Sequence, residues 1–108
     1  MAITVTRFDS EAFCGYKQFT TFFEDFGIAD YFGISAVKDT YKRAFDSWKH
    51  DYKYLTELVL VLNWKSWEHA QKNPKLSQLY ADLFYKAKDY AYDTLKGDEL
   101  SYFFHTID

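Results

Sequence analysis

The stretch NPKLSQLYADLFYKAKDYAYDTLKG, residues 73–97, carries the clearest structural signals in the chain. Asn73 suits the position that caps a helix, Pro74 suits the first helical position, and Gly97 is a typical stop. Between them apolar residues recur at helical spacing: Leu76, Leu79, Tyr80, Leu83, Phe84, Ala87, Tyr90, Ala91 and Leu95. We therefore expect a helix of about 22 residues, roughly 33 Å long.

Two further helices are expected before this one. The first begins near Ser35, and its apolar side reads Val37, Tyr41, Ala44, Phe45 and Trp48. The second covers about residues 52–71 and has two apolar stripes: Leu55, Leu58, Val59 and Leu62 on one side, and Leu60, Trp64 and Trp67 on another. Residues 49–53, KHDYK, contain neither Gly nor Pro, so the sequence leaves open whether the two helices are continuous. If they are, Asp46, Glu57 and Glu68 form an acidic row.

The two ends of the chain complete the expected fold. Residues 3–6 alternate between apolar and polar types, which suits a short strand or extended arm. A helix is expected from Ser10 to Phe26, followed by a loop over residues 27–33, GIADYFG, with at most one helical turn opened by Asp30. Asp98 is expected to cap a short last helix, residues 99–104. The predicted fold class is all-α: one compact bundle of four main helices and a short C-terminal one, in a single domain over residues 1–108.

Composition supports one globular domain and raises a question about its surface. The chain has 108 residues, of which 48% are hydrophobic and 27% charged, so it is not a disordered or low-complexity sequence. Aromatic residues make up 22% of it, as 11 Phe, 10 Tyr and 3 Trp. Two explanations stay open: the rings fill the core in place of Leu and Ile, or a surplus lies at the surface, where Tyr and Trp favour protein interfaces.

Charge is distributed unevenly along the chain. The net charge of −3 argues against a general nucleic-acid binder, which needs clustered Lys and Arg. Residues 8–35 hold five acids against Lys17, and residues 97–108 hold three acids and no base, whereas residues 36–96 hold eleven bases and eight acids. Either the faces of the protein complement one another, or an acidic face binds a basic partner. The partner-binding candidates are Glu24, Asp25, Asp30, Asp98, Glu99 and Tyr102.

Few residue patterns point to catalysis or cofactors. The four glycines form no phosphate-binding loop, and Cys14, the one cysteine, has no base beside it in the sequence. Asp46 with His50 shares a helix face, and Glu68, His69 and His105 are further potential ligands, but two ligands do not make a metal site. We expect no enzyme activity, no cofactor and no metal.

Two features of the sequence bear on where the protein is located. A single cysteine excludes an intrachain disulfide, which suits a reducing cytoplasm. The strongest apolar run, residues 58–64, is too short to cross a bilayer, which needs about 20 residues. We therefore expect a cytoplasmic protein that binds neither membrane nor nucleic acid directly.

The C-terminal half resembles a known group of proteins. From Leu58, the strings LVLVLNWKSWEHAQKN and LSQLYADLFYKAKDYAYDTLKGDELSYFFHTID resemble small uncharacterised accessory proteins of phages and conjugative elements of Gram-positive bacteria. The resemblance rests on Asn63, Trp64, Trp67, Glu68, Leu79, Tyr80, Tyr90, Ala91, Leu95, Lys96, Gly97, Glu99, Leu100, Tyr102 and Asp108. It assigns no residue a role.

The resemblance implies a protein from the accessory cargo of a mobile element. In size, charge and lack of catalytic residues the chain is similar to anti-CRISPR proteins, several of which mimic DNA to occupy the basic groove of a CRISPR-associated nuclease. This similarity implies a non-enzymatic inhibitor that binds a host protein. The alternative is a structural or regulatory homodimer whose interface is formed by Leu60, Trp64 and Trp67.

Overall fold

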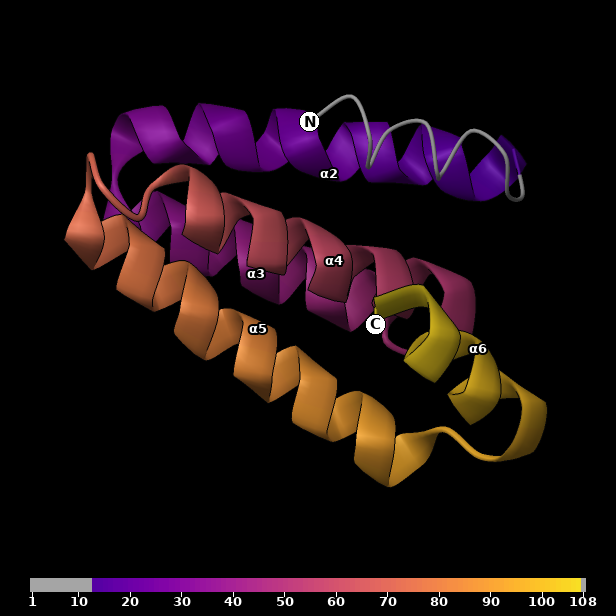
Figure 1. The fold of residues 1–108 in the computed structure, drawn as a ribbon. Helices are drawn as coiled ribbons and strands as arrows, with labels where there is room; N and C mark the ends of the chain where they lie inside the picture. Colours follow the sequence, from indigo (N-terminus) through magenta and orange to yellow (C-terminus); the bar gives the residue numbers. More distant parts are fainter. Residues whose placement is uncertain (1–12, 108) are drawn as a thin grey trace.

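The structure, a computed structural model, describes residues 13–107, with side chains from residue 22 onward. It contains α2 (Phe13–Phe32), α3 (Ile34–Trp48), α4 (Tyr52–Glu68), α5 (Pro74–Thr94) and α6 (Gly97–Ile107), and no strand occurs within these residues (Figure 1). The predicted all-α fold is confirmed. The strand or arm expected at residues 3–6 and the side chain of Cys14 lie outside the described part.

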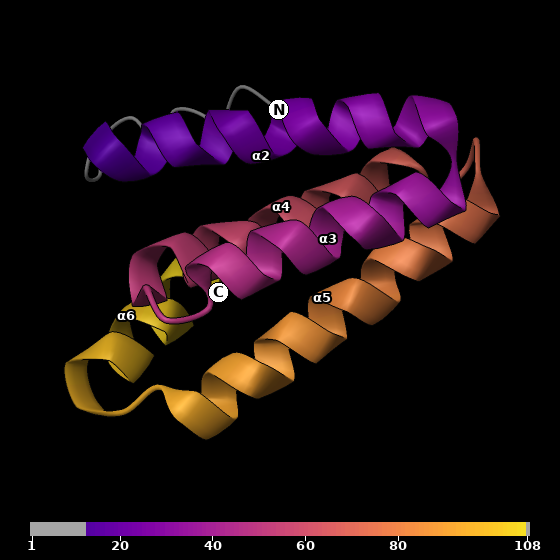
Figure 2. The same cartoon turned by 180° about the vertical axis from the view of Figure 1, so that it is seen from behind.

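Helix α4 is the centre of the bundle. It contacts α2, α3, α5 and α6, with α2 along one side and α5 along the other (Figures 1 and 2). The first stripe and the start of the second are buried, whereas Trp64 is half-buried and Trp67 is exposed near the end of the helix. The buried apolar residues of α4 are Leu55, Leu58, Val59, Leu60, Val61 and Leu62. Neither α4 nor any other helix within residues 13–107 is long and apolar enough to cross a bilayer.

The backbone breaks between α3 and α4. Asp51 is extended (φ −109°, ψ 107°), and its Oδ1 accepts hydrogen bonds from the backbone N–H groups of Lys53 and Tyr54. This side chain starts a new helix by satisfying two N–H groups that a helix start leaves free. Asp46 and Glu57 are therefore on different helices, and the acidic row does not form.

The signals at the start of α5 are confirmed. Asn73 Oδ1 accepts a hydrogen bond from the Leu76 N–H at 3.3 Å, and Pro74 is the first helical residue. The helix ends at Thr94, slightly before the expected stop, and Gly97, with φ +57°, begins α6. Helix α6 runs to Ile107, whose side chain packs against the core, so it is longer than the helix expected over residues 99–104.

The loop expected over residues 27–33 is wrong. Helix α2 continues through Gly27 to Phe32 and ends at Gly33, whose φ of +111° only glycine adopts readily. A glycine inside a helix costs about 1 kcal/mol, but Phe26 and Ala29 are buried against the core. This burial and the contacts of Asp30 described below offset the cost and extend the helix.

One carboxyl group lies inside the core. Glu57 on α4 is 1% exposed, and its Oε1 has no hydrogen-bond partner. Burial, and secondly the charge of Asp51, raise the pKa of Glu57 to about 8, against a smaller opposite effect of Lys53. The folded protein therefore holds Glu57 protonated at neutral pH.

This carboxyl group predicts that stability falls as pH rises. Between pH 4.5 and about 8 the folded state binds a proton at Glu57 that the unfolded state has released, so the free energy of unfolding decreases by up to about 1.4 kcal/mol per pH unit. Urea denaturation across this range measures the slope. Glu57→Gln should remove this contribution, because an amide does not titrate; an equal slope in both proteins would contradict the assignment.

Candidate functional site

Five polar side chains gather where the C-terminal ends of α2 and α4 meet the start of α5: Asp30, Lys65, Glu68, His69 and Tyr80. We call them the Asp30 cluster. Lys65 Nζ lies 2.6 Å from Asp30 Oδ2, and His69 Nε2 donates to the same oxygen at 2.8 Å. The Tyr80 hydroxyl donates to the other oxygen, Asp30 Oδ1. One carboxylate thus joins three elements that are distant in the sequence.

The cluster is sheltered from water. The side chain of Lys65 is 4% exposed and that of Asp30 is 14% exposed, while the outer member, Glu68, is half-exposed and lies 3.2 Å from Lys65 Nζ. Tyr80 is fully buried, and its ring stacks on that of His69 with centroids 5.7 Å apart. Removing one partner of such a sheltered ion pair is far more costly than removing one partner of a surface pair, because it leaves a charge without a partner in a medium of low polarity.

Tyr80 stays a hydrogen-bond donor at all ordinary pH values. Burial, then its hydrogen bond to Asp30 and the negative charges of Asp30 and Glu68, raise the pKa of the Tyr80 hydroxyl well above its usual range. The phenol therefore keeps its proton and supports the Asp30 carboxylate. It is unsuited to act as a general base, which must lose its proton near the working pH.

Potential metal ligands occur in this cluster, but a lysine competes with the ion. Asp30, Glu68 and His69 are the one group of three such residues in the described part of the chain, with ligand atoms within 4.8 Å of one another. The Lys65 ammonium already lies within 3.2 Å of both carboxylates. A divalent cation here would face a buried positive charge at close range. The arrangement thus favours an internal ion-pair network over a metal centre.

Four of the six predicted partner-binding residues are exposed, in two separate pairs, and the other two are not. Glu24 and Asp25 are exposed on α2, and Asp98 and Glu99 are exposed in the first turn of α6. Asp30 departs from the prediction, because its carboxylate is turned inward to Lys65, His69 and Tyr80. Tyr102 is half-buried, with its ring 5.2 Å from that of Tyr52.

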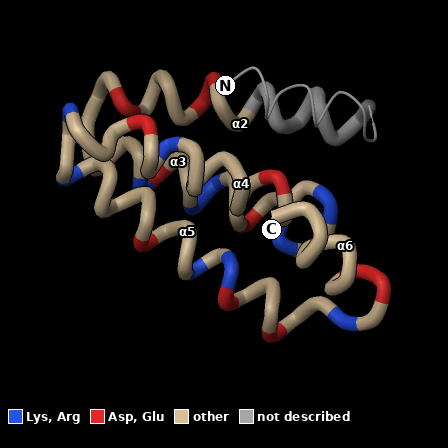
Figure 3. Tube along the Cα trace, in the orientation of Figure 1, with Lys and Arg blue, Asp and Glu red and all other residues tan. Residues whose placement is uncertain are grey.

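The two acidic ends do not form one surface. Asp30 contacts Tyr80 in α5, whereas α6 begins after the far end of that helix. Tyr80 and Thr94 are 14 positions apart in α5, a distance of about 21 Å along its axis. Figure 3 accordingly shows the acidic positions of α2 and of the start of α6 at separate places.

The proposed dimer stripe is also divided. Leu60 is buried inside the bundle, Trp64 is half-buried and Trp67 is exposed. Because Leu60 is 8% exposed, it offers little surface to a second chain, and the predicted interface would have to rest on the two tryptophans. Of the three residues, only Trp67 is largely exposed.

An apolar surface that the sequence did not reveal lies on α2. Ile28, Tyr31 and Phe32 are exposed, Tyr31 by 87% and Phe32 by 73%. Because the sequence predicts a loop over residues 27–33, it does not place these residues on a helix face. Once the helix continues, these residues share a face with Glu24 and Asp25, since helix positions three, four, seven and eight apart are neighbours. We call these five residues the α2 stripe.

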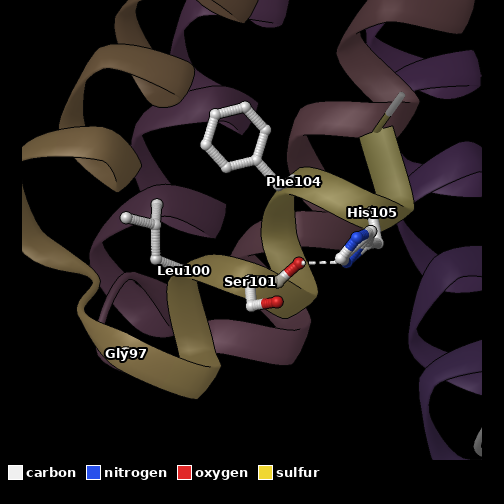
Figure 4. Close-up of a pocket in the computed structure, with 5 residues that line it drawn as sticks. All are labelled: Gly97, Leu100, Ser101, Phe104 and His105. Atoms are coloured by element: carbon white, nitrogen blue, oxygen red, sulfur yellow. Dashed lines mark hydrogen bonds between the residues drawn. The ribbon is translucent and has the colours of Figure 1, made fainter.

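Among the described residues, neither the hollow on α6 nor the surroundings of Asp46 on α3 brings together the residues of a catalytic or metal site. A shallow hollow on α6 is lined by Gly97, Leu100, Ser101, Phe104 and His105 (Figure 4). There His105 Nδ1–H donates to the Ser101 carbonyl at 3.1 Å, and no carboxylate joins it. Asp46, considered above with His50 as a metal pair, instead lies 3.6 Å from Lys42 and 4.0 Å from Lys49.

The Asp30 cluster predicts unequal effects of two lysine substitutions. Lys65→Met should lower the free energy of unfolding by about 3 kcal/mol, because the buried Asp30 carboxylate loses its counterion. Lys42→Met is the matched control: its pair with Asp46 is largely exposed and should contribute less than about 1 kcal/mol. Urea denaturation at pH 7 measures both variants, and equal losses would show that the cluster does not hold the fold.

Comparison with protein-family models, with curated proteins and with solved structures finds no match to this chain. The resemblance of the C-terminal half to mobile-element proteins therefore stays a hypothesis. The function must be inferred from the chain's own surfaces.

Proposed function

We propose that the protein is a non-enzymatic inhibitor that binds a host defence protein through the α2 stripe. The partner we favour is a CRISPR-associated nuclease, whose nucleic-acid groove is basic. The observation that carries the proposal is the combination, on one helix face, of two exposed carboxylates, Glu24 and Asp25, with two exposed rings, Tyr31 and Phe32.

The apolar half of the stripe has the composition of an interface centre. Large apolar side chains left in water are costly, and contiguous ones usually mark a binding surface. Tyr31 and Phe32 also contact each other edge-on, with ring centroids 5.5 Å apart. Such rings supply most of the binding free energy when a partner covers them, because each removes a large area from water.

The acidic half supports a basic partner. Residues 22–32 contain three acids and no base, and Asp30 is neutralised internally, so Glu24 and Asp25 provide the outward charge. A groove between α2 and α3 is lined by Asp25 and Phe32 of the stripe and by Arg43 of α3, whose positive charge offsets part of this outward charge. Surface charges of this kind raise the rate of encounter with an oppositely charged groove and weaken in salt.

The Asp30 cluster supports the proposal by fixing the stripe in place. Asp30 lies between Ile28 and Tyr31 in the sequence, and its carboxylate is tied to α4 and α5. A helix held in this way presents its side chains in one arrangement before binding. Less conformational freedom is then lost when the complex forms.

Charge and ring substitutions should weaken binding in different ways. Glu24→Lys with Asp25→Lys should reduce affinity at low salt and flatten its salt dependence, because the steering charge is reversed. Tyr31→Ala with Phe32→Ala should reduce affinity by at least about 2 kcal/mol, or roughly thirtyfold, at every salt concentration. Biolayer interferometry against CRISPR-associated nucleases of Gram-positive bacteria, paired with a DNA-cleavage assay, measures both effects.

The matched control reverses the other acidic group. Asp98→Lys with Glu99→Lys changes the net charge equally but lies on α6, so affinity should stay close to that of the parent protein. Absence of nuclease binding, or an affinity that salt leaves unchanged, would reject the proposed partner. If instead Tyr31→Ala with Phe32→Ala converts a dimer to a monomer in sedimentation, the stripe is a homodimer interface.

A further inference from the structure

A second surface lies away from the α2 stripe, in a cleft between α3 and α5. Its walls come from Lys38, Tyr41, Lys42, Phe45 and Asp46 on α3 and from Leu79, Asp82, Leu83, Lys86 and Tyr90 on α5. The cleft therefore combines aromatic rings, aliphatic side chains and charges of both signs. None of its residues belongs to the α2 stripe or to the Asp30 cluster, so it is an independent site.

Three rings form the apolar part of the cleft. Tyr41 and Phe45 are nearly parallel, at 21° with centroids 5.6 Å apart, and Tyr90 meets Phe45 edge-on at 5.0 Å. All three are half-buried, so each keeps part of its surface toward the cleft. Burial and the nearby charge of Asp46 raise the pKa of Tyr41 to about 12, which keeps its hydroxyl a donor at neutral pH. A flat aromatic ligand has rings to pack against here.

The charges in the cleft are only partly compensated. Lys42 pairs with Asp46 at 3.6 Å, and Asp82 accepts a hydrogen bond from Gln78 at 2.9 Å. Lys38 on α3 and Lys86 on α5 are exposed, and neither forms an ion pair with any residue in the described part of the chain. Two ammonium groups, one on each wall, are thus available to an anion.

We propose that this cleft binds a nucleoside monophosphate. The base packs against the rings of Tyr41 and Tyr90, and the phosphate lies between Lys38 and Lys86. Asp46 and Asp82 accept hydrogen bonds from the sugar hydroxyl groups, which inorganic phosphate does not have. A nucleic-acid strand or an acidic peptide would bring many negative charges past these two carboxylates, whereas a nucleoside monophosphate has a single phosphate group, which lies at the lysines.

NMR titration of the 15N-labelled protein tests the proposal directly. The four probes are AMP, GMP, CMP and UMP, with adenosine and inorganic phosphate as separate fragments. For a site of this size we expect a Kd on the order of 0.1–1 mM for at least one nucleotide. Shifts should be concentrated in residues of α3 and α5. Adenosine and phosphate alone should each bind at least about tenfold more weakly than the nucleotide, since each makes only part of the contacts.

Charge-reversal variants identify the phosphate site. Lys38→Glu with Lys86→Glu should weaken nucleotide binding by tenfold or more, because two charge-assisted contacts become repulsive. Lys72→Glu with Lys96→Glu is the matched control, since both lysines are exposed and lie outside the cleft. All four positions are exposed, so the variants should keep the fold, and circular dichroism verifies it.

Three outcomes would overturn the proposal. The first is the absence of shifts in α3 and α5 with any of the four nucleotides up to about 10 mM, well above the expected Kd. The second is binding of phosphate as tight as that of the nucleotides, which would mean that the rings contribute nothing. The third is equal weakening by the two lysine double variants, which would indicate general charge attraction.

Discussion

The carboxylate of Asp30 is the constraint on which the arrangement of this bundle depends. It accepts hydrogen bonds from His69 and Tyr80 and pairs with Lys65, and these partners come from α4, the turn after it and α5. Tyr80 and Lys65 are buried and His69 is half-buried, so losing the carboxylate would leave polar groups with little access to water. Hydrophobic packing brings the helices together, but it is non-directional and does not by itself set their relative position. The hydrogen bonds and the ion pair of Asp30 fix where along its length α2 meets α4 and α5.

How far the sequence predicts this fold depends on how local each signal is. The start of α5 could be predicted because Asn73 and Pro74 act on the helix in which they lie, and Asp51 acts in the same way on α4 once its role as a cap is seen. The end of α2 could not be predicted. Asp30 is separated by 39 residues from His69 and by 50 from Tyr80, so glycines at both ends of GIADYFG suggested a loop while the contacts that override them were distant.

The candidate binding residues show the same limit. Glu24 and Asp25 were found from charge alone and are exposed, whereas Asp30, chosen by the same criterion, is internal. A signal for the cluster did exist: Lys65 follows an apolar run in which a charged side chain must find a partner or a route to water. The surplus of rings is also divided, since Phe22, Phe26, Tyr80 and Phe103 fill the core while Tyr31, Phe32 and Tyr85 remain exposed. Composition indicates the surplus, but only the fold can say which rings belong to it.

Helix α3 lies between the two proposed binding surfaces, the α2 stripe and the cleft between α3 and α5. Asp39, Thr40 and Arg43 line the groove toward α2, whereas Lys38, Tyr41 and Lys42 line the cleft toward α5. Residues that alternate in this way belong to two faces of one helix, because consecutive positions differ by about 100° around its axis. A macromolecule on α2 therefore need not cover the cleft, since α2 and α5 lie on different sides of the bundle (Figure 2). Occupancy of one surface can influence the other only through a shift of α3, which the buried Val37 and the half-buried Phe45 resist by their packing.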